Sequence, residues 1–335
     1  MSFELRLEEQ GMTNSPIGIS VVIPSFNQGR FIDDAIRSLL DQLYPNLEVL
    51  VVDGGSTDDT VERLKRYGDR VHWVSEPDEG QSDAIAKGFS RATNPWMTWL
   101  NSDDVQCNNA LWAVAEAVEK DPAAEVITGR GHYMDEDGNG PRPYPTISVG
   151  LGIDVRKEMF EKGYVAQPSV FFRRTAYEAV GGIDRKLQFC MDYDLWVRFA
   201  LHGCRFVGID RDMSGNRWYE TTKSVGRFLD LASEVTATQV NLFGRVSPYF
   251  VQTVSDNLYQ RFHSVRFGDA NQMFYRLLYF KTVWVWFNAR QPWYCLKGLL
   301  FETIAKSSPV VNDKLTWAEC WRGMVGAVVR RLRRA

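Results

Sequence analysis

The chain has 335 residues, of which 44% are hydrophobic, 24% charged and 13% aromatic. This composition excludes intrinsically disordered, collagen-like and low-complexity proteins, and the length predicts about two domains. The formal net charge of −3 is unevenly distributed: residues 225–335 carry 15 Lys and Arg against 7 Asp and Glu, a balance of +8, which leaves −11 for residues 1–224. Because nucleic acids bind to positive surfaces, the acidic first part argues against a nucleic-acid partner and favours a divalent cation held by oxygen ligands.

The first segment, residues 1–17, is predicted to be an N-terminal extension. It has acidic residues where a secretory signal peptide has a basic stretch followed by an apolar one, so export is not indicated. No run in the chain approaches the ~18 apolar residues of a membrane-spanning helix. The five cysteines are scattered and form no C-x-x-C pair. They fit a reducing compartment, and we expect a cytoplasmic protein.

Residues 18–128 alternate between short apolar runs and segments with helical periodicity. This alternation is typical of an α/β fold in which helices flank an open, mostly parallel sheet. The predicted strands are 19–24, 47–52, 71–75, 96–100 and 125–128, and the predicted helices are 31–40, one that begins at 56–59, 81–91 and 108–120.

The pattern changes after residue 128. Residues 130–165 are rich in Gly and Pro, and we expect a long loop or a small insertion there. A strand at 169–172 and helices at 174–180 and 192–202 follow, and the residues beyond 224 have the pattern of amphipathic helices. The predicted organisation is a first domain at 18–224, with halves at 18–128 and 165–224, and a helical extension at 225–335.

Polar residues follow the first four predicted strands, at Pro24–Asn27, Asp53–Ser56, Glu76–Asp78 and Asn101–Asp104. Open parallel sheets bind ligands beyond the carboxyl ends of their strands. One acid in such a place is commonly a helix cap, but acids at three of four ends favour a binding site. The glycine patterns G-x-G-x-x-G and G-x-x-x-x-G-K-[ST] are absent, so we expect a metal ion to neutralise any bound phosphate.

Five motifs occur in order: Val21-Val-Ile-Pro-Ser-Phe-Asn27, Val51-Val-Asp-Gly-Gly-Ser-Thr-Asp-Asp59, Glu76-Pro-Asp-Glu-Gly-Gln-Ser-Asp-Ala84, Trp99-Leu-Asn-Ser-Asp-Asp104 and Met191-Asp-Tyr-Asp-Leu-Trp196. Together they resemble the family 2 glycosyltransferases, whose GT-A fold is Rossmann-like, over about residues 18–224. The resemblance implies inverting transfer of a sugar from a nucleotide-diphosphate-sugar, a UDP-sugar above all, with Mn²⁺ or Mg²⁺. The implied acceptor is a hydroxyl of a glycan or lipid-linked molecule in the synthesis of surface polysaccharide or glycoconjugate.

The resemblance also implies roles for single residues on the donor side. Asp53 would accept a hydrogen bond from the base, and Asp103 would be the metal ligand with Asp104 next to it. Asn101 stands where the family usually has an acid, so one charge is missing there. The residues implied to bind the nucleotide-sugar are Pro24, Ser25, Phe26, Asn27, Asp53, Asp78, Gln81, Asp83, Asn101, Ser102, Asp103, Arg217 and Lys223.

Inverting transfer also needs a carboxylate that takes the proton of the attacking hydroxyl. Asp192 and Asp194 are the candidates, and residues two apart on a helix point ~200° apart, so they do not share one site. Asp194 has Arg198 four residues on, which predicts an ion pair at the surface. Asp192 falls on the apolar face without such a partner, so we predict that it is the base. A helix N-cap is the alternative role for Asp192.

Residues on the acceptor side are less clearly marked. Gln167 and Trp196 are the predicted acceptor contacts, on the resemblance to the family. Arg217 and Lys223 lie in a segment that resembles the one closing over the diphosphate, where either would offset phosphate charge. A basic surface loop is the alternative reading of that segment.

Residues 275–335 mix tryptophans with basic residues in amphipathic patterns. The commoner explanation is a helical bundle packed on the first domain or on a second copy of the chain, which would make a homo-oligomer. The alternative is peripheral contact with an anionic membrane.

The leading hypothesis is thus a metal-dependent glycosyltransferase. A catalytically silent nucleotide-sugar or glycan-binding module of the same fold is the alternative, because position 101 lacks the acid and Met191 replaces a Glu of the family motif. A nucleotidyltransferase is disfavoured, since residues 24–29 are not a glycine-rich, basic loop.

Overall fold

The computed structural model describes residues 16–146, 154–161, 163, 165–219, 222 and 227–254. Most of the predicted N-terminal extension, Lys223 and the predicted contact region 275–335 lie outside these residues. In the described part, none of the helices has the length and apolar character needed to cross a bilayer. The chain divides into two compact units, one ending at Val235 and the other beginning at Thr236. The boundary predicted at residue 224, between the first domain and the helical extension, stays a prediction.

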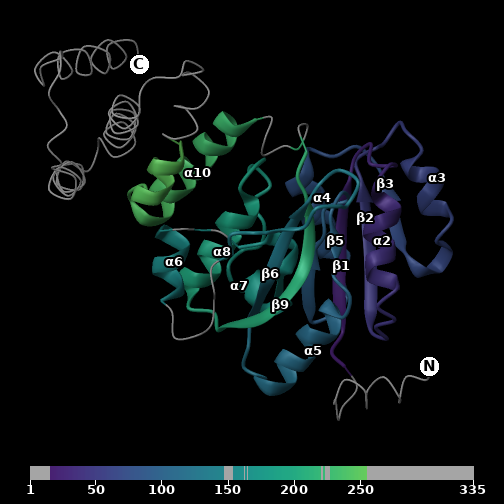
Figure 1. Ribbon diagram of the computed structural model, residues 1–335, viewed down its shortest axis with the longest axis horizontal. Coiled ribbons are helices and arrows are strands. Elements are labelled where there is room, and N and C mark those ends of the chain that lie inside the picture. The colour runs from purple at the N-terminus through teal and green to yellow at the C-terminus, as the bar shows by residue number, and fades with distance from the viewer. Residues whose placement is uncertain are drawn as a thin grey trace, which may run out of the picture. The chain divides into compact units, whose positions relative to one another are not determined.

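The first unit is built on one mixed sheet with strand order β3-β2-β1-β4-β8-β6-β9-β5, and β7 pairs with β6 (Figure 1). The strands β3, β2, β1 and β4 run parallel, as do β6 and β9, whereas β8 is antiparallel to both of its neighbours. The predicted α/β fold with a mostly parallel sheet is therefore confirmed. The strands are β1 (Ile19–Ser25), β2 (Leu47–Asp53), β3 (His72–Ser75), β4 (Trp96–Trp99), β5 (Val105–Gln106), β6 (Val126–Met134), β7 (Arg142–Pro143), β8 (Val170–Arg173) and β9 (Phe206–Arg217).

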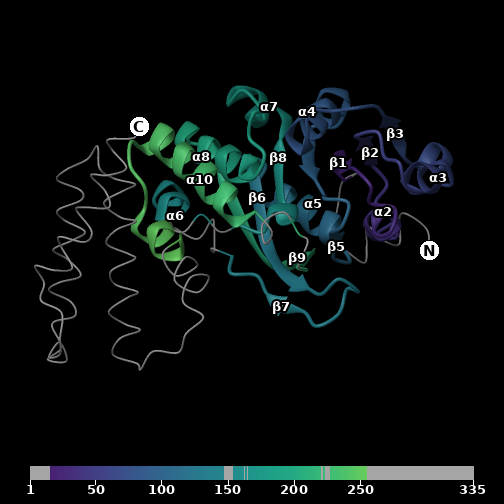
Figure 2. The same ribbon diagram turned by 90° about the horizontal axis from the view of Figure 1, so that it is seen from above.

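Helices cover both faces of this sheet (Figure 2). The helices of the described residues are α2 (Ile32–Leu40), α3 (Thr60–Lys65), α4 (Gln81–Arg91), α5 (Ala110–Lys120), α6 (Val155–Glu161), α7 (Arg174–Ala179), α8 (Met191–His202) and α10 (Phe228–Phe243), with the short 3₁₀ turns η1 (Gly68–Arg70) and η2 (Gln167–Ser169). Alternate residues of β1 face opposite sides. Val21 joins the core with Ile36 of α2 and Leu111 of α5. On the other face, a Cβ at Gly88 of α4 would lie 2.3 Å from Val22 Cγ1, so α4 packs closely on β1 there.

A cluster of aromatic rings fastens α8 to the sheet. Trp196 of α8 stacks on Trp99 of β4, with ring centroids 5.3 Å apart and planes at 22°. Phe172 of β8 contacts Trp196, and Phe89 of α4 meets Trp99 edge-on. Such pairs contribute about 0.5–1.5 kcal/mol each beyond the area that they bury. The cluster thereby fixes where the first turn of α8 lies relative to the end of β4.

The sequence predicts the elements up to residue 128 well and those beyond it less completely. The loop expected at 130–165 is partly wrong, because β6 continues to Met134 and the segment also contains β7 and α6. The strand β9 was not predicted. Asp210, Arg211 and Asp212 interrupt its pattern and Ser214 is a buried polar residue, so no apolar alternation marks it. It forms because it pairs with β6 along Val126–Met134.

Candidate active site

A pocket of about 800 Å³ lies at the carboxyl ends of β1 and β4, which is within the usual range for small-molecule sites. Its wall includes the loops after β1, β3 and β4, the first turns of α4 and α8, η2, and the ends of β6 and β9. The predicted site residues that line it are Pro24, Ser25, Phe26, Asp78, Gln81, Asn101, Ser102, Asp103, Asp104, Gln167, Asp192 and Arg217. The structure therefore brings most of the predicted donor-binding residues, both predicted metal ligands and the predicted base to one cavity.

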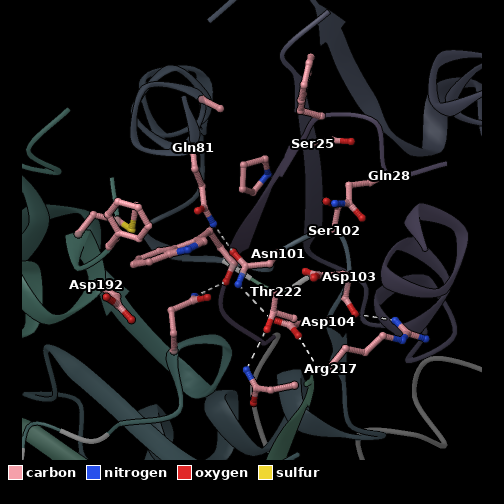
Figure 3. Close-up of a pocket in the computed structure, with 18 of the residues that line it drawn as sticks. Ser25, Gln28, Gln81, Asn101, Ser102, Asp103, Asp104, Asp192, Arg217 and Thr222 are labelled. Carbon is pink, nitrogen blue, oxygen red and sulfur yellow. Dashed lines mark hydrogen bonds between the residues drawn. The ribbon is translucent and has the colours of Figure 1, made fainter. Parts of the chain in front are cut away.

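An acidic pair, Asp103 and Asp104, follows β4 on one side of the pocket (Figure 3). Asp104 is buried, and its carboxylate accepts hydrogen bonds from Asn101 Nδ2 at 3.0 Å and from the Arg217 backbone N–H at 2.9 Å. Asp103 accepts a bond from the Tyr219 hydroxyl at 2.9 Å. Burial raises the pKa of both carboxyls, and the charge of Asp103 raises the pKa of Asp104 further. A cation beside the acidic pair would remove much of this electrostatic cost.

The acidic pair fits a divalent cation of the Mg²⁺ or Mn²⁺ type. Such ions in nucleotide sites are held by one or two carboxylates, and phosphate oxygens and water complete the shell. Among the described residues, no group of three or more His, Cys, Asp or Glu forms a metal cluster. Asn101, which stands where the family has an acid, accepts a bond from Gln81 Nε2 at 2.8 Å and donates to Asp104. Its amide therefore orients Asp104 and adds no charge.

Arg217, at the end of β9, connects the loop after β4 with the segment after β6 and with α2 through hydrogen bonds. Its Nη1 donates to the Asp103 backbone oxygen at 2.6 Å, its Nε to the Glu136 backbone oxygen at 3.1 Å and its Nη2 to Asp34 at 2.7 Å. The guanidinium also lies 4.9 Å from the centre of the Phe31 ring. The side chain is nearly fully buried. These hydrogen bonds use three of the five N–H groups of the guanidinium, and Arg217 lines the pocket, so its contact with a phosphate stays a prediction.

Asp192 lies on the other side of the pocket from the acidic pair (Figure 3). It is the second residue of α8, whose N-cap is Cys190, so the alternative role of N-cap is wrong. The carboxylate is half-buried and accepts a bond from the Tyr193 N–H at 2.8 Å. Burial raises the pKa of Asp192 to about 6, and the charges of Glu234 and Asp194 act in the same direction. Such a carboxyl is suited to proton transfer near neutral pH.

Asp194 takes the structural role that its spacing predicts. Its carboxylate accepts bonds from Arg198 Nε at 2.8 Å and Nη2 at 2.6 Å. Asp194 is absent from the pocket lining. The ion pair of Asp194 is therefore as predicted, and Asp192 lines the pocket. The predicted surface position of the pair is wrong, because Asp194 is buried.

Glu234 of α10 accepts hydrogen bonds from the backbone just before α8. This role of Glu234 was not predicted from the sequence. Its carboxylate accepts bonds from the N–H groups of Gln188 at 2.7 Å, Phe189 at 2.6 Å and Cys190 at 2.8 Å. Backbone donors at the start of a helix favour a negative charge. Glu234 thus fixes the segment that carries Asp192, from a position 42 residues along the chain.

Asp53, the residue expected to contact a base, is instead an organiser of its own loop. It is fully buried, and its carboxylate accepts bonds from the Ser56 N–H at 2.9 Å, the Gly55 N–H at 3.2 Å and the Ser75 hydroxyl at 2.6 Å. It does not line the pocket, whereas Gly54 beside it does. The expected contact between Asp53 and a base is therefore not supported.

Three further predicted contacts also fall outside the pocket lining. Asn27 adopts a left-handed backbone conformation (φ 52°) and accepts a bond from the Thr57 N–H at 2.8 Å. Asp83 is buried in an ion pair with Lys87 at 3.0 Å. Trp196 is 1% exposed, so the predicted acceptor contact has no accessible surface there. Asp83 and Trp196 are thus buried outside the lining, and Asn27 is exposed in the loop after β1.

The fold and the pocket define a GT-A-type α/β protein. The crystal structure of S. aureus TarS 1–349 in complex with UDP-GlcNAc matches with a TM-score of 0.54 over 80% of this chain and 82% of that one, at 16% identity, which shows the fold alone. Residues 20–181 match the family described as glycosyl transferase family 2. The chain therefore carries a family 2 glycosyltransferase domain.

Two curated relatives are also named as glycosyltransferases. An uncharacterized glycosyltransferase of Rickettsia conorii is 28% identical over 54% of this chain and 31% of its own length. TuaG of Bacillus subtilis, whose name assigns it to teichuronic acid biosynthesis, is 34% identical over 38% of this chain and 52% of its own length. The chain thus spans between about a third and about half of the length of these relatives.

Proposed function

We propose that the protein transfers a sugar from a nucleotide-diphosphate-sugar to a hydroxyl group of a glycan or lipid-linked acceptor, with inversion at the anomeric carbon. The observation that carries this proposal is the placement of Asp192 opposite Asp103 and Asp104 within a single pocket. The acidic pair suits the side of the leaving diphosphate, and Asp192 suits the side of the attacking hydroxyl.

In the proposed reaction, Asp192 accepts the proton of the acceptor hydroxyl as its oxygen attacks the anomeric carbon. The bond from that carbon to the diphosphate oxygen breaks on the opposite face, and the nucleoside diphosphate leaves with the bonding electrons. With a pKa of about 6, about 90% of Asp192 is ionised at pH 7 and ready to accept the proton. A divalent cation held by Asp103 and Asp104 would neutralise the charge that develops on the leaving group.

The comparisons support the finer parts of the proposal by similarity. The TarS structure contains UDP-GlcNAc, and TuaG bears a name from polysaccharide synthesis. A UDP-sugar donor and an acceptor in surface polysaccharide or glycoconjugate synthesis are therefore the first to test.

The second candidate function is a nucleotide-sugar-binding module without catalysis. Asn101 favours it, since the amide leaves the acidic pair with one negative charge fewer than the family pattern has.

The test combines binding and turnover on the intact chain. A thermal-shift screen of UDP-, GDP- and dTDP-sugars with Mn²⁺ or Mg²⁺ identifies the donor, because a ligand at 100 times its Kd stabilises by ~2.7 kcal/mol. Release of nucleoside diphosphate then reports transfer or slow hydrolysis. The enzyme proposal requires that Asp192→Asn keeps donor binding and loses turnover, and that Asp103→Ala loses both. Donor binding without any turnover in the native protein would establish the binding module instead.

A further inference from the structure

Three aromatic rings form a platform in the pocket lining: Tyr133 on β6, Tyr144 after β7 and Trp218 after β9. The centroids of Tyr133 and Tyr144 are 4.6 Å apart, and those of Tyr133 and Trp218 are 5.1 Å apart. Trp218 is 43% exposed. Packing alone does not account for so large an apolar ring facing a polar pocket.

Backbone pairing fixes the positions of these rings. The Trp218 N–H donates to the Met134 oxygen at 2.9 Å, and the Tyr144 N–H donates to the Gly131 oxygen at 3.0 Å. The backbones of Trp218 and Tyr144 are therefore both hydrogen-bonded to β6, which carries Tyr133. Tyr133 lies in register with Arg142 of β7 on one side. The platform is therefore largely formed before a ligand arrives, which lowers the entropic cost of binding.

The platform lies on the side of η2. Gly131 and Tyr133 are two residues apart on β6 and share one face of the sheet. A Cβ at Gly131 would lie 2.6 Å from Ala166 Cβ, so this face packs against the start of η2, which carries Gln167. On β9, the residue paired with Tyr133 is Asn216, whose Nδ2 lies 3.5 Å from Asp104 Oδ2.

The platform continues the wall that carries the acidic pair. Trp218 follows Arg217, whose backbone N–H donates to Asp104 at 2.9 Å and whose Nη1 donates to the Asp103 backbone oxygen at 2.6 Å. A ligand stacked on the platform would therefore lie next to the acidic pair, in the same pocket as Gln167.

We propose that Tyr133, Tyr144 and Trp218 bind a pyranose ring of the acceptor by stacking. The proposal rests on the proposed function and narrows its acceptor to a glycan. The C–H groups on one face of a pyranose are apolar and weakly positive, which complements the negative face of an aromatic ring. Its hydroxyls point outward, toward polar groups such as Asn216 and Gln167 in the same lining.

The experiment is saturation-transfer NMR of the intact protein with a mixture of methyl glycosides and disaccharides of glucose, galactose, N-acetylglucosamine and rhamnose. We expect saturation of the C–H protons on one ring face. It should persist in Trp218→Phe and fall at least tenfold in Trp218→Ala. Thermal stabilisation of Trp218→Ala by UDP with Mn²⁺ checks that the variant is folded and that the base does not use the platform.

Equal saturation in Trp218→Ala, absence of saturation in the native protein, or loss of the UDP shift in Trp218→Ala would each overturn the stacking proposal. The proposed function fails by a different result, namely no stabilisation of the native protein by any nucleotide-sugar. A tenfold rise in acceptor KM with an unchanged donor KM in Trp218→Ala would support both.

Discussion

Replacement of Asp192 by Asn should lower turnover by orders of magnitude and stabilise the protein at the same time. The pKa of Asp192 is raised from 3.8 to about 6, and each unit corresponds to ~1.4 kcal/mol, so the charged carboxylate lowers the free energy of unfolding by at most about 3 kcal/mol. Because the folded-state pKa is the higher one, this cost is absent below about pH 4, grows as the pH rises and is complete above about pH 6. Asn has nearly the same shape and no charge.

The assay measures both consequences on one variant. Urea unfolding at pH 7 should show a gain of up to about 3 kcal/mol for Asp192→Asn, and the gain should vanish at pH 4. Turnover should fall by about 10²–10⁴, as for the loss of a general base. Asp194→Asn is the matched control on the same helix. It should lose stability through the Arg198 pair and keep the turnover of the folded fraction.

The opposite pattern would refute the reasoning. An Asp192→Asn protein that is less stable at pH 7 would mean that the native carboxylate is stabilised where it lies. Turnover close to that of the native protein would remove Asp192 as the base.

Three other predictions concern the same framework. In the native protein, kcat/KM should fall about tenfold between pH 7 and pH 5, because protonation of Asp192 with a pKa of about 6 removes the base; a flat rate profile over this range would contradict it. Glu234→Gln should lower the free energy of unfolding, measured by urea denaturation, by about 1–2 kcal/mol, because charge-assisted bonds to three N–H groups weaken. It should also move the acid limb of the pH–rate curve to lower pH, because the charge of Glu234 raises the pKa of Asp192. Gly88→Ala should cost about 1–3 kcal/mol in urea unfolding, since its Cβ would lie 2.3 Å from Val22 Cγ1, whereas Ser90→Ala at an exposed position should stay within about 0.5 kcal/mol.

The sequence predicts the parallel part of the sheet because β1, β2 and β4 are buried and read as apolar runs. The assignment of Asp192 and Asp194 to opposite roles followed from helical geometry and one ion-pair spacing. The structure shows the ion pair of Asp194 and places Asp192 in the pocket lining, and the role of Asp192 as the base stays a prediction. The placement of Asp103 and Asp104 at a strand end followed from the rule for open sheets.

The remaining features depend on contacts between distant segments. Asp53 stands where a ligand contact is expected, but its carboxylate accepts hydrogen bonds from Ser56 and Ser75 instead. No local sequence pattern distinguishes an Asp that binds a ligand from one that orders its own loop. The hydrogen bonds from Glu234 to the start of α8, and the meeting of Tyr133 with Trp218, arise only when α10 and β9 reach their places in the fold. A residue's type and neighbours do not encode such partners.

The bond between Glu234 and the turn before α8 changes where the domain should be cut for expression. A fragment that stops at residue 224 contains all five motifs and yet lacks the carboxylate that accepts bonds from three N–H groups just before α8. The turn before α8 would lose these bonds, and Asp192, the proposed base, would follow a less constrained segment. An excised domain intended for crystallisation or kinetics should therefore retain α10.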